Sequence, residues 1–141
     1  MKEFRFKKVS EDAKISMPVY SGDAGYDVCA IESVLIPAKE SKEVRTGIAI
    51  EVPEEYFVLV RTRSGHGVKR DIQLHHGLID AGYRNEITVR VYNHSSMNQY
   101  IQKGEKICQL VILPRTILPL VEVKELSETD RGMNGLGSTG K

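Results

Sequence analysis

The sequence predicts an all-β protein built as one domain. The chain has 141 residues, which is close to the length of a single domain. Ile and Val together number 26, whereas Ala and Leu number 16. β-Branched residues favour strands, whereas Ala and Leu favour helices. Short apolar segments also recur about every 8–12 residues between Gly, Pro and Asp, the pattern of sandwiches and barrels.

Eight segments have the apolar pattern of a strand. The residues between 44 and 52 contain Gly47, which predicts a bulge or a close backbone approach there. The continuous apolar run at 56–60 predicts a strand buried on both faces, whereas the alternation at 87–91 predicts a half-buried strand. The predicted strands lie at residues 4–6, 26–29, 34–36, 44–52, 56–60, 87–91, 107–113 and 117–123.

The end of the chain has a different composition from the rest. Four of the twelve glycines fall within the last ten residues. Such a segment cannot bury a core of its own, because glycine adds backbone freedom and no apolar surface. We therefore expect a single β domain over residues 1–129 and a mobile C-terminal arm over residues 130–141.

Charge, hydropathy and cysteine content exclude several classes of protein. Lys plus Arg number 20 and Asp plus Glu 19, and this balance argues against a nucleic-acid partner. No stretch approaches 18 apolar residues, so no membrane span is expected. The first residues are charged and no apolar segment follows, which predicts no secretory signal. Cys29 and Cys108 form no close-spaced motif and are expected as reduced, buried thiols in a cytosol-like compartment.

Five clusters of small, charged and glycine residues interrupt the strand pattern. Each cluster alone is weak, because Arg-Ser-Gly is a common turn and Gly-Glu-Lys-Ile a common strand entry. Their order and spacing carry the information. The clusters are DAGYDV at 23–28, RSG at 63–65, GLIDAGYR at 77–84, GEKICQLV at 104–111 and RGMNGLGSTG at 131–140.

In this order the five clusters resemble the five motifs of the trimeric dUTPase family, over residues 23–140. The resemblance implies a distorted jelly-roll or β-clip-type barrel that assembles as a homotrimer with shared active sites, each closed by a neighbour's arm. It implies hydrolysis of dUTP to dUMP and pyrophosphate, with Mg²⁺ and with water attacking the α-phosphorus. Such a reaction limits uracil in DNA and supplies dUMP for dTMP synthesis, in the cytoplasm or, for a viral protein, in the host cytosol or nucleus.

The third motif supplies the candidate catalytic residue. Asp80 follows an apolar pair and precedes Ala81 and Gly82, which places its carboxylate at a strand end beside a turn. The resemblance implies that Asp80 holds the attacking water, and a carboxylate can accept the proton that water loses. By the same resemblance, the Tyr83 ring lies under the deoxyribose and excludes a 2′-hydroxyl.

The same motif implies contacts to the base. The segment 73–77 is expected to contact the uracil edge, largely with backbone groups. Family members often carry Asn near position 74, where this chain has Leu. The remaining substrate-binding candidates of the motif are Gly77, Leu78 and Ile79.

Three other motifs imply contacts to the phosphates and the metal. Arg63, Ser64 and Gly65 match the motif that touches phosphate oxygens, since Arg offers a planar fork and Gly allows close backbone approach. Gln109 matches a phosphate-binding glutamine. Asp27 matches a carboxylate that supports Mg²⁺ through water, which suits an ion that keeps several waters.

The arm motif completes the implied site. Arg131 resembles the arginine that pairs with the γ-phosphate. Leu136, followed by Gly137, stands where most members have an aromatic residue that stacks on uracil. Leucine gives apolar cover without stacking, so we expect the arm to close less tightly than is usual in the family.

Two alternatives stay open. A dCTP deaminase of the same fold would need a glutamate ten residues after the Asp, and this chain has Arg90 there, a cation that cannot act as a base. A catalytically silent β-trimer could instead bind the nucleotide as a sensor.

Overall fold

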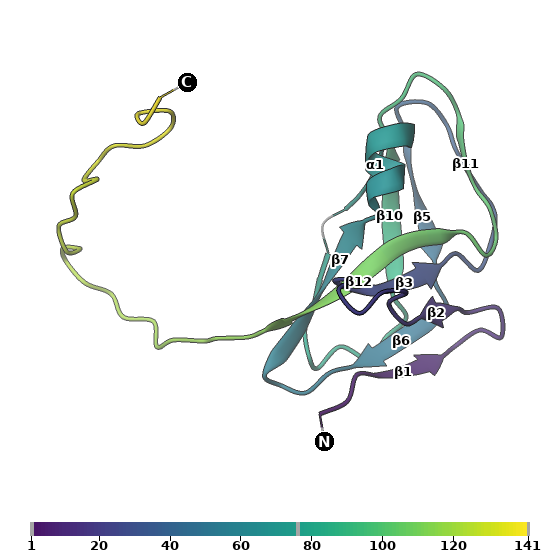
Figure 1. The fold of residues 1–141 in the computed structure, drawn as a ribbon, viewed down its shortest axis with the longest axis horizontal. Helices are drawn as coiled ribbons and strands as arrows, with labels where there is room; N and C mark the ends of the chain where they lie inside the picture. The colour runs from purple at the N-terminus through teal and green to yellow at the C-terminus, as the bar shows by residue number, and fades with distance from the viewer. Residues whose placement is uncertain (1, 76, 141) are drawn as a thin grey trace.

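The computed structural model describes residues 2–75 and 77–140 and confirms the all-β prediction (Figure 1). The described residues contain twelve strands and one short helix. The elements are β1 (Arg5–Lys8), β2 (Ile15–Ser16), β3 (Tyr26–Cys29), β4 (Val34–Ile36), β5 (Ser41–Arg45), β6 (Ile48–Glu51), β7 (Tyr56–Thr62), α1 (Ser64–Arg70), β8 (Ile72–Leu74), β9 (Gly77–Ile79), β10 (Thr88–Asn93), β11 (Gln99–Ile101) and β12 (Lys106–Pro114).

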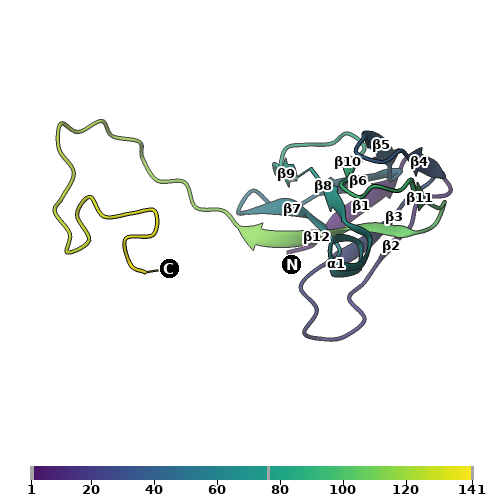
Figure 2. The ribbon, with the colours of Figure 1, turned by 90° about the horizontal axis from the view of Figure 1, so that it is seen from above.

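The strands form four antiparallel sheets in a jelly-roll-like arrangement, seen from a second direction in Figure 2. The largest sheet has the order β2-β3-β12-β7-β9, and a second has the order β5-β10-β8. The remaining strands pair as β1-β6 and β4-β11. β12 is the longest strand and lies between β3 and β7, so residues from three distant parts of the chain meet along it.

One apolar core joins the sheets. Ile36, Ile48, Ile72, Ile101 and Leu110 are fully buried or nearly so, and they come from five different strands. Burying each such side chain contributes roughly 1.5–3 kcal/mol. The sheets are therefore held together by shared side chains rather than by continuous strand pairing.

The predicted strand over 44–52 is two strands. β5 pairs with β10, whereas β6 pairs with β1. Gly47 stands between them with a φ of 66°, a left-handed conformation that favours glycine. A Cβ at Gly47 would lie 2.9 Å from the Ser10 Cβ, so the close approach that the sequence predicted is present.

The predicted strand over 117–123 is wrong. β12 ends at Pro114, and Arg115 makes hydrogen bonds to the carbonyl oxygens of Glu54 and Glu55 at 2.9 and 2.7 Å. From there the chain runs away from the body without helix or strand (Figure 1). Residues 117–123 have a strand-like apolar pattern, but no described strand pairs with them and their side chains are exposed.

Two further expectations concern burial and membranes. Cys29 and Cys108 are free and buried, as predicted. Burial raises the pKa of the Cys108 thiol to about 12. Within the described part of the chain, the model has no helix that is both long enough and apolar enough to cross a membrane.

Candidate active site

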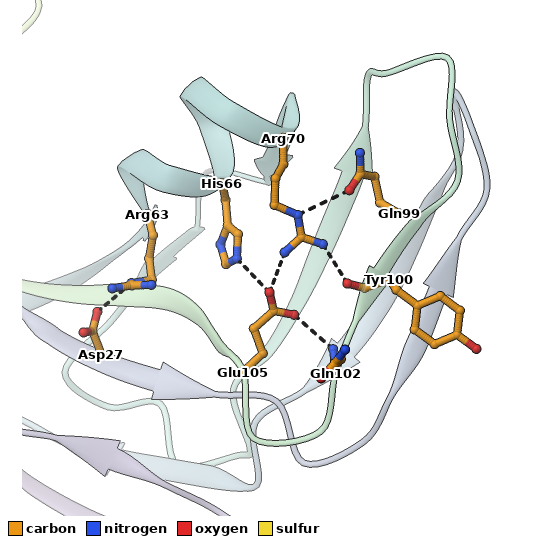
Figure 3. A network of polar contacts seen from close by, with 8 residues as sticks. All are labelled: Asp27, Arg63, His66, Arg70, Gln99, Tyr100, Gln102 and Glu105. Carbon is orange, nitrogen blue, oxygen red and sulfur yellow. Dashed lines mark hydrogen bonds and ion pairs between the residues drawn. The ribbon is translucent and has the colours of Figure 1, made fainter.

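The first candidate group lies where α1 meets β3 and β12, and we call it the α1 cluster: Asp27, Arg63, Ser64, Gly65, Lys106 and Gln109. Arg63 Nε donates to Asp27 Oδ1 at 3.0 Å (Figure 3). Lys106 Nζ lies 3.0 Å from Asp27 Oδ2. The half-buried Asp27 carboxylate therefore holds two cations, and the pairing leaves one positive charge in excess beside α1.

Strand register brings these residues together. On β12, Gln109 lies opposite Asp27 of β3 and opposite Arg61 of β7. Gly25 permits this close packing, because a Cβ there would lie 2.4 Å from the Leu110 carbonyl oxygen and 2.9 Å from Gln109 Cγ. The first and fourth sequence motifs thus meet side by side, as neighbouring strands of one sheet.

The second motif begins α1, where the sequence predicted only a turn. Arg63 is the N-cap residue, in extended conformation, and its carbonyl oxygen accepts the N–H groups of His66 and Gly67 at 3.1 Å each. A Cβ at Gly65 would meet no atom within 4 Å. Gly65 is therefore not required by packing inside this chain, and it leaves the backbone of the first turn open to an incoming group.

A second polar network holds α1 further along, and the sequence did not reveal it (Figure 3). Glu105 Oε1 accepts Arg70 Nη1 and lies 3.3 Å from the buried His66 Nε2. Glu105 Oε2 accepts the Gln102 backbone N–H at 3.0 Å. The only sequence signals were a histidine after Arg-Ser-Gly and an acidic residue in the fourth motif, and neither indicates a pairing.

The ionisation of Glu105 reflects this setting. Burial acts to raise the pKa of Glu105, but the Gln102 N–H, the Arg70 charge and the His66 hydrogen bond together outweigh it. The pKa of this carboxyl therefore lies below its ordinary value. Glu105 carries its charge at neutral pH, which the ion pair with Arg70 requires.

The second candidate group is strand β9 and the turn that follows it, residues 77–84. Asp80 follows β9 directly and is exposed. Its backbone carbonyl oxygen accepts the Tyr83 N–H at 3.0 Å, which is the strand-end turn that the sequence predicted. Tyr83 is 41% exposed and its hydroxyl donates to the Glu86 carbonyl oxygen at 3.2 Å. Gly77 and Ile79 lie against β7, and Leu78 is exposed.

The segment predicted to contact uracil joins β8 to β9. Leu74 is buried and its N–H donates to Thr62 Oγ1 at 3.0 Å, which ties the segment to the end of β7. The His75 N–H donates to the Arg90 carbonyl oxygen at 2.9 Å. His76 lies outside the described residues.

The α1 cluster and Asp80 lie at opposite ends of β7. Gly77 pairs with Val60 and Ile79 with Val58, so Asp80 is level with position 57. Arg63 follows six residues further along extended backbone, a distance of about 20 Å at the rise of a strand. One chain therefore does not bring the two candidate groups to a common point.

The third candidate group is the arm, residues 130–140 of the described chain. Arg131 Nε donates to the Asn134 carbonyl oxygen at 2.9 Å, a bond inside the arm itself. Leu136 is fully exposed, and Leu136 and Gly137 have positive φ values of 43° and 88°. The structure does not bring Arg131, Leu136 or Gly137 to either of the other groups.

Metal ligands can also be assessed from the side chains. The described residues contain no group of three or more His, Cys, Asp or Glu side chains placed to hold an ion. Both oxygens of Asp27 already face cations. This donor set does not fit direct ligation of a metal ion by Asp27, and it leaves room only for a contact through water.

Comparison with known proteins gives a consistent result. Residues 11–140 match the family model dUTPase. The chain is 40% identical to a deoxyuridine 5′-triphosphate nucleotidohydrolase of Clostridioides difficile, over 99% of each chain. It is 44% identical to one from Hydrogenobaculum sp., over 95% of each chain.

Solved structures of dUTPases are also similar to this chain. The dUTPase of Staphylococcus bacteriophage 80alpha with dUPNHPP superposes with a TM-score of 0.93 at 29% identity, covering 99% of each chain. A variant of the phage phi11 dUTPase, described as revealing the coordination of a structural Mg(II) ion, gives a TM-score of 0.84 at 26% identity, covering 89% of this chain and 99% of that one. The match extends over the sheets, α1 and most of the tail, and the chain belongs to the dUTPase family.

Proposed function

We propose that this protein hydrolyses dUTP to dUMP and pyrophosphate. The observation that carries the proposal is the match to dUTPases over residues 11–140, which takes in all three candidate groups. Relatives about 40% identical over nearly the whole chain are nucleotidohydrolases of dUTP, and the phage 80alpha enzyme was solved with a dUTP analogue. Hydrolysis limits uracil in DNA and supplies dUMP for dTMP synthesis.

The α1 cluster binds the phosphates in this proposal. Asp27 fixes the Arg63 guanidinium, so the fork of donors is oriented before the substrate arrives. Ser64 and Gly65 offer a hydroxyl and an open stretch of backbone, and Gln109 adds an amide from β12. Lys106 adds a second cation on the same carboxylate, which favours a polyanion.

Asp80 activates water. Asp80 is exposed at the end of β9. Its carboxylate accepts a proton from water as the water oxygen attacks the α-phosphorus, and pyrophosphate is the leaving group. Tyr83, fixed by its bond to the Glu86 carbonyl oxygen, lies under the deoxyribose and rejects a ribose by steric exclusion of the 2′-hydroxyl. Gly77, Leu78, Ile79 and the preceding segment hold the base.

The complete site is shared between copies of the chain in a homotrimer. Arg63 and Asp80 of one chain are separated by about 20 Å along β7, by the rise of an extended strand. Neighbouring phosphates of one triphosphate require closer partners than that. Arg63 of one copy therefore acts with Asp80 of a second, and the arm of a third covers the nucleotide. In this arrangement the β domain lies within residues 1–129, and residues 130–141 are the closing arm.

Mg²⁺ accompanies the substrate. When bound, the ion neutralises phosphate charge and keeps the triphosphate in one conformation. Asp27 would hold the ion through water, because its own carboxylate oxygens interact directly with Arg63 and Lys106. Two free buried thiols, Cys29 and Cys108, are in keeping with a reducing compartment such as the cytoplasm.

Deamination of dCTP is disfavoured because residue 90, where a deaminase would need a general base, is arginine. Arg90 lies on β10 with its guanidinium paired to Glu43 Oε1 at 2.9 Å. A guanidinium in an ion pair is a permanent cation and takes no proton from water. The other alternative, a catalytically silent protein that binds the nucleotide as a sensor, has to be distinguished from the enzyme by experiment.

The test is product analysis. The protein is incubated with each deoxynucleoside triphosphate and Mg²⁺, and we expect dUMP and pyrophosphate from dUTP alone. In ¹⁸O-labelled water the label should enter dUMP, because the α-phosphorus is attacked. Tight binding of dUTP without product would favour the sensor, and deoxyuridine triphosphate formed from dCTP would favour the deaminase.

A further inference from the structure

Helix α1 is intrinsically weak, yet it carries the residues that orient phosphate. It has seven residues, two of them glycine, and its N-cap side chain makes no capping hydrogen bond. Isolated helices of this length are unstable in water, and glycine is a poor helix former. The conformation of Ser64 and Gly65 must therefore be held by contacts outside the helix.

Those contacts converge on one carboxylate. Glu105 Oε1 receives Arg70 Nη1 from the last turn of α1 and faces the buried His66 Nε2 from the first turn at 3.3 Å. Figure 3 shows both side chains pointing from the helix toward Glu105. One acceptor thus fixes the rotation of α1 at two points about one helical turn apart.

Glu105 is itself held rigidly. Its Oε2 accepts the Gln102 N–H at 3.0 Å, and its backbone carbonyl accepts the Ala30 N–H at 2.9 Å. Arg70 also contacts the preceding strand β11, through Nη2 to the Tyr100 carbonyl oxygen at 2.6 Å and Nε to Gln99 Oε1 at 3.3 Å. The anchor of the helix is the β11–β12 turn, which leads directly into Lys106 and Gln109.

We propose that Glu105 is a positioning residue for triphosphate binding: through His66 and Arg70 it sets the position of Ser64 and Gly65 relative to Gln109. The inference rests on the proposed function, because it assumes that these three residues contact phosphate. Glu105 itself touches no substrate, since its carboxylate oxygens are occupied by His66, Arg70 and Gln102.

The readout that separates positioning from general stability is a ratio of affinities. Dissociation constants are measured for dUPNHPP and for dUMP, which lacks the two outer phosphates. Glu105→Gln removes the charge that Arg70 and His66 share, and we expect binding of dUPNHPP to weaken about five- to tenfold while that of dUMP changes less than twofold. Arg70→Gln should give a smaller change in the same direction, because His66 still contacts Glu105.

The matched control is Arg45→Gln. Arg45, at the end of β5, also pairs with a glutamate distant in sequence: its Nη2 lies 2.9 Å from Oε2 of Glu86, in the loop before β10. The Arg45→Gln variant should be less stable in urea, but the ratio of its dissociation constants for dUPNHPP and dUMP should not change. An unchanged ratio in both Glu105→Gln and Arg70→Gln, or an equal change in Arg45→Gln, would overturn the inference.

The same experiment distinguishes this inference from the proposed function. If the unsubstituted protein fails to bind dUPNHPP or to hydrolyse dUTP, the proposed function is wrong. If the unsubstituted protein binds dUPNHPP and hydrolyses dUTP, and the variants have the same ratio of dissociation constants, then only the role proposed for Glu105 is wrong. Should Glu105→Gln fail to fold, Arg70→Gln, at a half-buried position, decides the matter alone.

Discussion

In the α1 cluster, the Arg63 guanidinium is held by a 3.0 Å ion pair to Asp27 on β3, whereas the Arg131 guanidinium bonds, among the described residues, to a carbonyl oxygen three residues away within the arm. Both arginines are candidate phosphate ligands. The fold holds the Arg63 guanidinium in place, whereas no described contact with the body holds that of Arg131. A side chain that the fold already holds in place can bind phosphate without a further loss of conformational entropy. Contacts made by the arm must first offset the entropy lost when its residues become ordered, roughly 1–2 kcal/mol per residue.

The largest expected effect concerns the body. Asp80→Asn preserves size but cannot take a proton from water, so kcat should fall about 100-fold or more with little change in substrate binding. Asp80 is exposed and makes no described side-chain ion pair, so the fold should survive. Steady-state kinetics together with a binding measurement check this. A kcat within threefold of the parent protein would remove Asp80 from the mechanism.

The next effect concerns the arm. Arg131→Ala leaves a phosphate charge unpaired under the closed arm, which should lower kcat/KM by about 10- to 100-fold. Leu136→Ala removes only apolar cover and should cost less. Parallel measurements of kcat/KM for dUTP rank the two. A greater loss in Leu136→Ala would mean that residue 136 does more than cover the base.

A gain is expected from the reverse change at the same position. An aromatic ring adds roughly 0.5–1.5 kcal/mol beyond burial when it lies on another ring, so Leu136→Phe should tighten substrate binding about three- to tenfold. The Kd for dUPNHPP measures this in the parent protein and the variant. Weaker binding by the Phe variant would show that residue 136 does not lie over uracil.

The sequence predicted the features that depend on local residue patterns and missed those that depend on contacts between distant residues. Strands at 26–29 and 34–36 were predicted with the bounds that the structure has, because they are short apolar segments bounded by turn residues. Asp80 at a strand end was predicted for the same local reason. Helix α1 was missed because its Gly-rich sequence has low helix propensity, and the contacts with Glu105 that stabilise it come from a distant turn.

The error at 117–123 has a different physical origin. Its apolar and β-branched residues have the propensity for a strand, but a strand also needs a partner, and no described strand lies beside it. Likewise, a motif comparison assigned Asp27 to a metal, and only coordinates could place Arg63 and Lys106 on its two oxygens. Long-range pairing is the part that local sequence patterns do not contain.

A smaller effect tests the rigidity of the strands below the α1 cluster. Cys29 follows Asp27 by two residues and Cys108 precedes Gln109, and both thiols are buried with raised pKa values, chiefly because burial disfavours the thiolate. Neither should react with an aromatic disulfide reagent at pH 8 within minutes, and both should react in urea. Rapid reaction of Cys108 in the native protein would show that β12 opens.

The smallest effect is a pH dependence of stability. The lowered pKa of Glu105 means that its contribution to stability is present above the unfolded value of about 4.3 and is lost as the pH falls through the folded value. The difference in urea midpoint between the parent protein and Glu105→Gln should therefore stay constant from pH 7 to about pH 5 and shrink as the pH falls below about 4.3. A difference that stays constant at the lower pH values as well would contradict the ion pair with Arg70.

The central claim is that a preorganised body and an unanchored arm from different copies form one site. The direct measurement mixes an Asp80→Asn chain with a chain lacking residues 130–141, after unfolding and refolding together so that copies exchange. Each variant alone should be nearly inactive, and the mixture should recover dUTP hydrolysis, because some sites then combine an intact Asp80 with an intact arm. No activity above the sum of the separate variants, in oligomers shown to contain both chains, would contradict it.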